Sequence, residues 1–145
     1  MQNYQYLIIP IVTLIISQLI KLIVETIKEK KFNFKRFLNG YGGMPSTHSA
    51  LTSSLATIIG INIGFDSPLF AITTIFTFIV IVDAVGVRLE SEKQAEAIND
   101  ISKQINKNNK FKIFNLKEQI GHEPLEVFAG VILGIISAAI FSIIL

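Results

Sequence analysis

Hydrophobic residues in this chain gather into four long stretches, which polar segments separate. The stretches cover residues 6–27, 49–65, 68–82 and 127–145. A helix needs about 20 residues to cross the ~30 Å hydrocarbon core of a bilayer, and each stretch reaches or approaches that length once its ends are included. An irregular segment could not satisfy its backbone in lipid. The pattern therefore predicts an all-α integral membrane helical bundle, a single domain over 1–145 whose four transmembrane helices lie roughly at 5–27, 48–65, 68–87 and 125–145.

The composition favours this assignment over a soluble bundle of buried helices. Hydrophobic residues make up 50% of the chain, and the mean hydropathy is +0.54, whereas a small soluble domain needs polar cover over most of its surface. The chain has no Cys and only two His. This excludes disulfides, thiolate nucleophiles, cysteine zinc sites and a three-His zinc centre. We expect no cofactor, no bound metal and no nucleic-acid partner.

The second stretch is less hydrophobic than the others and carries several hydroxyls, which suit the interior of a bundle better than a lipid-facing surface. Small residues recur at every fourth position in the second and fourth stretches. They are Ala56, Gly60 and Gly64 in the second, and Gly130, Gly134 and Ala138 in the fourth. Small residues at this spacing let two helix backbones approach closely. We therefore expect the second and fourth helices to form the central pair.

The charges are distributed unevenly, although the net charge is only +2. All 13 Lys and Arg residues lie at 21–36 and 88–117. By the positive-inside rule, the loops at 28–47 and 88–124 face the cytoplasm, and both termini lie outside the cell membrane that this multi-pass chain crosses. In the longer loop, the isoleucines at 98, 101 and 105 fall at helical spacing. They predict an amphipathic helix on the membrane surface or against the bundle.

Both histidines stand at the expected cytoplasmic start of a small-residue helix. His48 lies in Gly-Gly-Met-Pro-Ser-Thr-His-Ser-Ala at 42–50, where Ser46 or the residue after it can cap the helix. His122 lies in Gly-His-Glu-Pro-Leu-Glu-Val at 121–127. The free N–H groups and the positive dipole end of each helix start favour an anion, phosphate above all.

The spacing of His122 and Glu126 adds a candidate catalytic group. These residues are four apart, so in a helical turn they share a face, and a carboxylate beside an imidazole fixes its tautomer and raises its basicity. Two imidazoles, a carboxylate and two anion-binding helix ends indicate phosphoryl transfer through histidine, with His48, His122 and Glu126 as catalytic residues. The alternative is that both histidines simply lie in the interfacial zone at capped helix ends.

Other polar residues at the same membrane edge are candidates for binding phosphate or supporting the site. Asp83 lies near the inner end of the third stretch, where an acid is costly unless functional or paired, and Arg88 is its expected partner. Lys21 and Glu25 are four apart and are expected to form an ion pair or to snorkel to the interface. The candidate phosphate ligands are Arg36, Gly43, Ser46, Thr47, Arg88 and Lys117, with Asp83 and Lys21 in support. The basic residues could instead contact lipid headgroups.

Three longer motifs follow one another along the chain. They are Gly-Gly-Met-Pro-Ser-Thr-His-Ser-Ala at 42–50, Asp-Ala-x-Gly-Val-Arg at 83–88 and Leu-Lys-Glu-x-x-Gly-His-x-Pro-x-Glu-Val at 116–127. They resemble the divergent type 2 phosphatidic acid phosphatase family, a distant relative of the acid phosphatases and vanadium-dependent haloperoxidases. The resemblance implies a metal-independent phosphatase acting on a lipid phosphate or pyrophosphate. It makes His122 the residue that forms a phosphohistidine and His48 the acid that protonates the leaving group.

The chain departs from the classical pattern of that superfamily at several positions. Thr47 replaces the Gly of Pro-Ser-Gly-His, and Glu126 replaces the Asp of His-x3-Asp, which orients the nucleophile. The Ser-Arg pair before the second His is absent, and Arg36 is followed by Phe instead of Pro. Arg88 or Lys117 would then have to supply the missing charge.

Two other functions are open on the same residues. The scaffold could bind or transport a phosphorylated lipid without cleaving it, or it could use Asp83, Glu126 and His122 as ligands for a divalent ion. The expected partners are a phosphorylated lipid substrate and the membrane lipids. Because four helices are fewer than the superfamily typically has, by the resemblance, we also expect a homodimer through the first or third helix.

Overall fold

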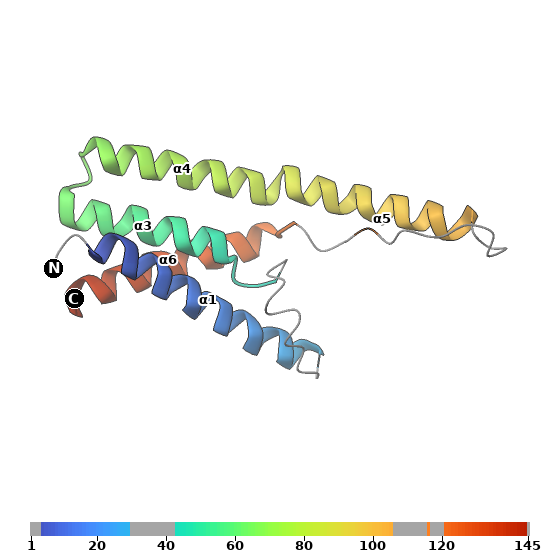
Figure 1. The fold of residues 1–145 in the computed structure, drawn as a ribbon, viewed down its shortest axis with the longest axis horizontal. Helices are drawn as coiled ribbons and strands as arrows, with labels where there is room; N and C mark the ends of the chain where they lie inside the picture. Colours follow the sequence, from blue (N-terminus) through green and yellow to red (C-terminus); the bar gives the residue numbers. More distant parts are fainter. Residues whose placement is uncertain (1–3, 30–42, 106–115, 117–120, 145) are drawn as a thin grey trace.

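The computed structural model describes residues 4–29, 43–105, 116 and 121–144 of the chain. Their long regular elements are α1 (Gln5–Glu29), α3 (Thr47–Ile63), α4 (Pro68–Val85), α5 (Val87–Ile105) and α6 (Pro124–Ile144). Figure 1 shows α1, α3, α4 and α6 packed as a bundle and α5 reaching beyond it. The described residues contain helices and no strand. The predicted all-α membrane bundle is confirmed.

Among the described residues, three helical stretches are long and apolar enough to cross a membrane, by length and composition. They are Gln5–Ile27, Pro68–Ile105 and Pro124–Ile144. The second stretch contains α4 and α5, which follow one another nearly in line (Figure 1). The fourth apolar helix, α3, has 17 residues, somewhat fewer than the ~20 that a full crossing takes. The four predicted helices are therefore present, and one of them is short.

The short helix α3 lies in the interior of the bundle, where it contacts α1, α4 and α6. Most of its residues are buried, and many carry hydroxyls. These hydroxyls bond to carbonyls one turn earlier in the same helix: Ser53 Oγ donates to the Ser49 carbonyl at 2.6 Å, and Thr57 Oγ1 donates to the Ser53 carbonyl at 2.7 Å. A buried hydroxyl that finds such a partner avoids most of the cost of desolvation. This explains how a weakly hydrophobic helix occupies the centre, as predicted.

The predicted pairing of the second and fourth helices is confirmed as the contact between α3 and α6, with the two glycines of α6 at its centre. A Cβ added at Gly134 would lie 2.5 Å from the Ala50 carbonyl oxygen and 2.9 Å from the Ser54 nitrogen. A Cβ at Gly130 would collide with the Ser46 carbonyl. Both glycines therefore admit the backbone of α3 itself.

Two of the three small residues predicted to form the contact on α3, Gly60 and Gly64, do not lie against α6. Gly60 lies against the rings of Phe65 and Phe70, which belong to the turn after α3 and to α4. Gly64 has φ +120° and ends α3, a conformation that L side chains rarely adopt. The face that meets α6 carries Ser46, Ala50 and Ser53 instead. A stripe defined by Gly and Ala overlooked serine, which is nearly as small and satisfies its own hydroxyl within the helix.

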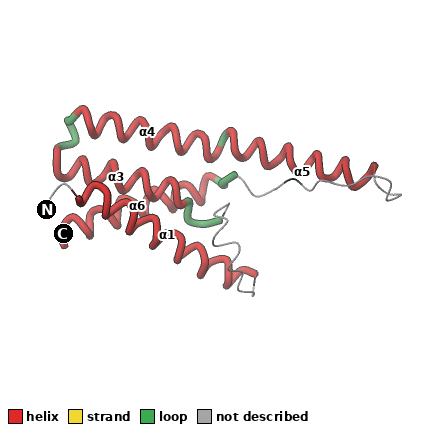
Figure 2. Tube along the Cα trace, viewed as in Figure 1, coloured by secondary structure: helices red, strands yellow, loops and turns green. Residues whose placement is uncertain are grey.

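The bundle has two distinct ends. The N- and C-terminal ends of the described chain and the turn between α3 and α4 lie at one end (Figure 2). There Ser67 caps α4 by accepting from the Phe70 N–H at 3.2 Å. The starts of α3 and α6 and the junction of α4 with α5 lie at the other end (Figure 2). Both histidines therefore fall at one end of the bundle, which we call the site end.

The predicted amphipathic helix is present as α5, but it is placed differently. It continues the line of α4 out of the bundle (Figure 1), so it neither packs back on the bundle nor could lie flat on a membrane that α4 crosses. Its isoleucines at 98, 101 and 105 are exposed. Its buried residues are Ala95 and Asn99. The buried face of α5 is thus the one that carries Ala95 and Asn99, and the face with the isoleucines is exposed.

Candidate functional site

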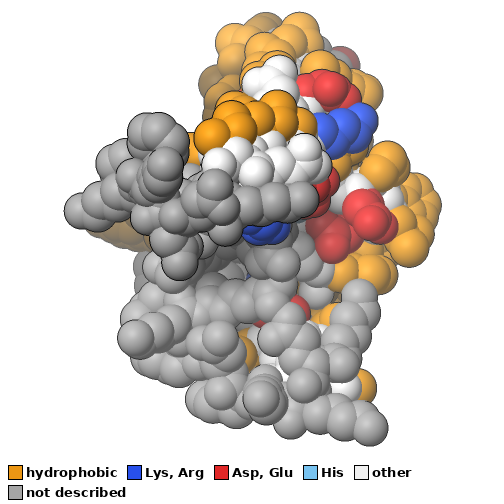
Figure 3. Space-filling view, turned by 90° about the vertical axis from the view of Figure 1, so that its right-hand side faces the viewer, with side chains coloured by type: hydrophobic (Ala, Val, Ile, Leu, Met, Phe, Trp, Pro, Cys, Tyr) orange, Lys and Arg blue, Asp and Glu red, His pale blue; other side chains and the backbone are white. Residues whose placement is uncertain are grey.

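Two backbone hydrogen bonds bring the three sequence motifs together at the site end. The Ser46 N–H donates to the Glu126 carbonyl at 2.9 Å, which joins the first motif to the third. The His122 N–H donates to the Ala84 carbonyl at 3.2 Å, which joins the third motif to the second. Residues 38 and 80 positions apart in the chain are thereby joined into one frame. Charged side chains of both signs show among hydrophobic ones on this end of the molecule (Figure 3).

The first motif starts α3 and is anchored there by Ser46. Ser46 is the N-cap: its Oγ accepts from the Ser49 N–H at 3.5 Å and lies 2.9 Å from the Ser49 Oγ. Its side chain is fully buried. Helix geometry leaves the next two N–H groups, those of Thr47 and His48, without an intrahelical acceptor. They are the backbone groups at the start of α3 that could donate to an anion, and phosphate binding here, including by the Ser46 side chain, stays a prediction.

Lys21 lies inside the site rather than at its margin. It is only 7% exposed, and its side chain, like that of Glu25, lies against Gly43 of the first motif. The predicted snorkelling of Lys21 to the interface is therefore wrong. One turn earlier in α1, Ser17 Oγ donates to Thr47 Oγ1 at 3.4 Å. The buried face of α1 thus brings an ammonium group and a hydroxyl to the start of α3.

His122 is held in a defined tautomer by its own chain. Its side chain is 6% exposed, and Nδ1 lies 2.7 Å from the Gly121 carbonyl oxygen. A carbonyl oxygen can only accept, so Nδ1 carries the proton in the neutral ring and Nε2 is left with a lone pair. Nε2 is therefore the atom that can act as nucleophile or base.

The surroundings of His122 favour its neutral form. Burial lowers the pKa of His122 from its ordinary value, and the nearby positive charges of Lys21 and Arg88 lower it further. The hydrogen bond with Gly121 and the negative charge of Glu92 act in the opposite direction and are outweighed. Because neutral imidazole is the nucleophilic form, the site keeps His122 ready to react at neutral pH.

This shift predicts the pH dependence of any reaction that needs neutral His122. Since the pKa is lowered, the acid limb of the kcat/KM profile should fall below the ordinary histidine value of about 6.5. Arg88→Gln removes a charge that lowers the pKa, so its acid limb should move to higher pH. Profiles of both proteins measured in the same nanodiscs test this. An acid limb that stays in place in Arg88→Gln would contradict the electrostatic account.

His48 shares the electrostatic surroundings of His122 but is more open. It lies in the first turn of α3, and its side chain is exposed. The charges that act on it come from Arg88, His122, Lys21 and Asp83. The charges of Lys21 and Arg88 therefore act on both histidines, of which His122 is buried and His48 is exposed. An exposed imidazole can exchange protons with water, which suits an acid or base better than a nucleophile.

The second motif contributes the predicted ion pair. Arg88 Nε donates to Asp83 Oδ2 at 2.5 Å, with both side chains about 40% exposed. The pair joins the end of α4 to the start of α5 across Gly86. This contact engages Nε, and a guanidinium has five N–H donors in all. Asp83 thus orients Arg88, while binding of phosphate by Arg88 stays a prediction.

Glu126 caps its own helix. Its Oε2 accepts from the Glu123 N–H at 3.3 Å, which is the reach-back half of a capping box. Pro124 has no N–H, and the Glu126 N–H donates to the Glu123 carbonyl at 3.0 Å. The start of α6 therefore has fewer N–H groups for an anion than the start of α3. At His122 Nδ1 the Gly121 carbonyl oxygen fills the orienting role that the sequence assigns to Glu126. The predicted contact between Glu126 and His122 stays a prediction.

Two predicted phosphate ligands, Arg36 and Lys117, lie outside the described residues. The ligands of the metal alternative, Asp83, Glu126 and His122, are all described. In this part of the chain no three His, Asp or Glu side chains form a group suited to a metal ion. The divalent-ion alternative therefore has no geometric support from these three residues.

Sequence reasoning missed the residues of α5 that position the third motif. Asn99, 2% exposed, accepts from the Leu116 N–H and donates to the Leu116 carbonyl, both at 2.8 Å. Glu92 Oε2 accepts from the Gly121 N–H at 2.8 Å. These contacts hold the chain on both sides of 117–120, directly before His122. The spacing of Glu92, Ala95 and Asn99 on one helix face was the signal that could have revealed them.

Removing the Asn99 amide should loosen this segment. Asn99→Ala loses both bonds to Leu116 and leaves backbone groups unsatisfied, so we expect a loss of about 1–3 kcal/mol in stability. Gln104→Ala, which removes an exposed amide from the same helix, should cost much less. Thermal unfolding of both variants in the same detergent measures this. Equal unfolding temperatures would show that Asn99 does not hold the segment.

Comparisons with known proteins agree with the motifs. A family model described as "Divergent PAP2 family" matches residues 2–137. A similar protein, "Uncharacterized membrane protein YuiD" of Bacillus subtilis (strain 168), is 37% identical over 134 residues, which cover 85% of this chain and 84% of the relative. No solved structure matches the chain.

Proposed function

The chain belongs to the divergent PAP2 family, and on this premise we propose that it is a membrane phosphatase that hydrolyses a lipid phosphate or pyrophosphate through a phosphohistidine. The observation that carries the proposal is the frame made by the two backbone bonds, Ser46 to Glu126 and His122 to Ala84. It joins the segments that carry His48, His122 and Arg88 at the site end, where the charges of Arg88 and of Lys21 from α1 act on both histidines. Family membership alone would not assign this chemistry.

In the first step, His122 Nε2 attacks phosphorus while the bond from phosphorus to the leaving oxygen breaks. His48, protonated, donates its proton to that oxygen, so the dephosphorylated lipid leaves as a neutral alcohol when a monoester is cleaved. General acid catalysis of this kind contributes about 10²–10⁴-fold. The phosphoryl group is then carried on His122.

In the second step, His48, now neutral, takes a proton from a water molecule that attacks the phosphohistidine. The nitrogen–phosphorus bond breaks, inorganic phosphate leaves, and both histidines return to their initial states. Lys21, Arg88 and the N–H groups at the start of α3 would stabilise the phosphoryl oxygens as charge builds on them. A buried ammonium group is more effective there than a solvated one, because water screens it less.

The positive-inside rule gives the orientation that we propose. The basic residues at 21–36 and 88–117 flank the site end in sequence, so the site faces the cytoplasmic leaflet of the cell membrane and both termini lie outside. The substrate is then a lipid of that leaflet. A homodimer completes the proposed arrangement.

A phosphate-release screen tests the proposed function. The purified chain in nanodiscs should release inorganic phosphate from at least one of phosphatidate, phosphatidylglycerophosphate and a polyprenyl pyrophosphate, with chelator present throughout. Each lipid is compared with an equal amount added to empty nanodiscs. No release above that background from any of these lipids would count against catalysis.

One observation favours the second candidate, a protein that binds or transports a phosphorylated lipid without cleaving it. Glu126, which replaces the orienting Asp of the classical motif, bonds to its own helix start. Lasting binding of intact phosphatidate in the same nanodiscs, without release of phosphate, would establish this function instead.

A further inference from the structure

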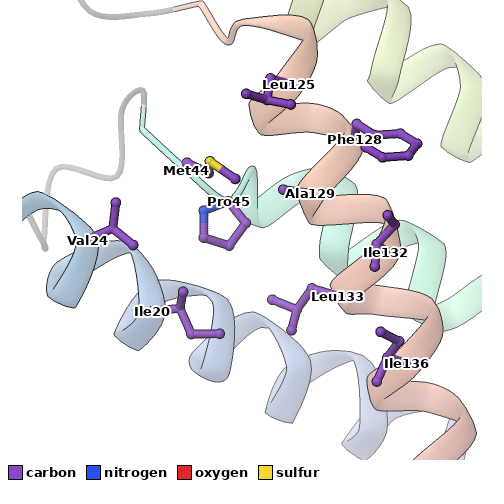
Figure 4. Close-up of a pocket in the computed structure, with 10 residues that line it drawn as sticks. All are labelled: Ile20, Val24, Met44, Pro45, Leu125, Phe128, Ala129, Ile132, Leu133 and Ile136. Carbon is purple, nitrogen blue, oxygen red and sulfur yellow. The ribbon is translucent and has the colours of Figure 1, made fainter.

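An apolar groove of about 410 Å³ lies between α1 and α6 beside the candidate site (Figure 4). Its volume falls within the range of small-molecule pockets. Ile20 and Val24 of α1 form one wall, Met44 and Pro45 close the end near α3, and α6 forms the other wall. Every lining side chain is apolar. Phe128 on the α6 wall is 62% exposed, so the groove opens to the surroundings of the bundle, which in a membrane are lipid.

The groove and the polar site are built by neighbouring residues on the same three elements. Ile20 precedes Lys21 on α1, Pro45 precedes the α3 cap Ser46, and Leu125 precedes Glu126 on α6. The backbone that places each polar group therefore also places an apolar group beside it. A molecule with a charged head and an apolar chain could occupy both at once.

The length of the groove matches one leaflet of a bilayer. On α6 it runs from Leu125 to Ile136, which at 1.5 Å per residue is roughly 16 Å. This is about half of the ~30 Å hydrocarbon core. The groove thus extends from the site end to about the middle of the membrane, as a chain of a lipid in the adjacent leaflet does.

We propose that this groove holds a hydrocarbon chain of the phosphorylated lipid whose head group occupies the site. The inference rests on the proposed function for the head group and adds the binding of the chain. Lipid tails are as apolar as the groove, so entering it brings no hydrophobic gain. Affinity comes from the phosphate, and the groove fixes the direction of the chain and thereby the position of phosphorus relative to His122.

Quenching of a single tryptophan tests this, since the chain has no Trp of its own. Phe128→Trp places the reporter in the groove. Phe78→Trp on α4 is the matched control: Phe78 is also 62% exposed. Phe78 lies six residues before Ala84, and Phe128 lies six residues after His122. The His122 N–H donates to the Ala84 carbonyl, so the two counts start at the same level of the bundle. Both reporters therefore lie at similar depth.

The probe is a phosphonate analogue of phosphatidate with brominated chains, which a phosphatase cannot cleave, in phosphatidylcholine nanodiscs. We expect half-maximal quenching of Phe128→Trp at a mole fraction about tenfold lower than for Phe78→Trp. The same phosphonate analogue with unbrominated chains should reverse it, and phosphatidylcholine with those chains should not. Equal quenching of the two variants would overturn the proposal. Weaker quenching of Phe128→Trp would also overturn it, because a second copy of the chain would then cover the groove.

These results separate the groove from the catalytic proposal. Preferential quenching without phosphate release in the screen would support the groove and leave a lipid-binding protein. Phosphate release with equal quenching would support catalysis and overturn the groove.

Discussion

Replacing His122 with Ala is expected to abolish phosphate release, by on the order of 10⁴-fold or more, as in other enzymes that lose their covalent nucleophile. The reason is that no other described side chain at the site end offers a buried neutral nitrogen with a fixed lone pair. The phosphoenzyme should disappear as well. Trapping with radiolabelled lipid phosphate, followed by acid and alkali treatment, would measure it, because phosphohistidine is labile in acid.

Two further variants make this result interpretable. His122→Asn keeps a side-chain N–H that can donate to the Gly121 carbonyl, so it should fold like the native chain while remaining inactive. His48→Ala should still form the phosphoenzyme but turn over about 10²–10⁴-fold more slowly. Wild-type rates in His122→Ala or His122→Asn would disprove the mechanism.

Gly134→Ala should cause the largest loss of stability among single-methyl changes in α6. Its Cβ would lie within 2.9 Å of two backbone atoms of α3, and backbone cannot move aside as a flexible side chain can. Overpacking costs about 1–3 kcal/mol, and we expect the upper end here. In an open helix the same change would gain up to about 1 kcal/mol from helix propensity. The collision with α3 therefore decides that Gly134→Ala lowers the stability instead of raising it.

Unfolding of Gly134→Ala in detergent, followed by circular dichroism, measures this effect. Ala139→Val, which adds methyl groups at an exposed position of the same helix, is the control and should change stability little. An unfolding temperature at or above that of the native chain would show that α3 and α6 can separate freely. The close packing described here would then be wrong.

The helical bundle could be predicted from the sequence. Each long apolar stretch has to cross the hydrocarbon core, and it can do so only as a helix that satisfies its own backbone. The interior place of α3 was also predictable, since its hydroxyls suit contact with other helices better than contact with lipid. The placement of His48 and His122 at one end of the bundle was predictable as well, because each stands at the start of a helix on the same side. In each case the pattern of residues along the sequence is compatible with one arrangement of the helices in a membrane.

Other features depend on tertiary contacts that no local pattern fixes. Lys21 fits an interfacial position by spacing alone, and its burial follows from the approach of the first motif, where Gly43 makes room for it. The isoleucines of α5 suggested the wrong buried face. Asn99 is buried instead because the chain before α6 returns alongside it, which the sequence of α5 alone does not reveal.

The bonds that frame the site join main chain to main chain, from Ser46 to Glu126 and from His122 to Ala84. A substitution changes a side chain and leaves these N–H and C=O groups in place, so long as proline is not introduced at the donors. Side chains at the motif positions can thus be substituted while the backbone frame of the site is kept. Thr47 and Glu126 can differ from the classical residues without dismantling it. Differences in residue identity at the motifs of this chain are therefore a poor measure of differences in the backbone structure of the site.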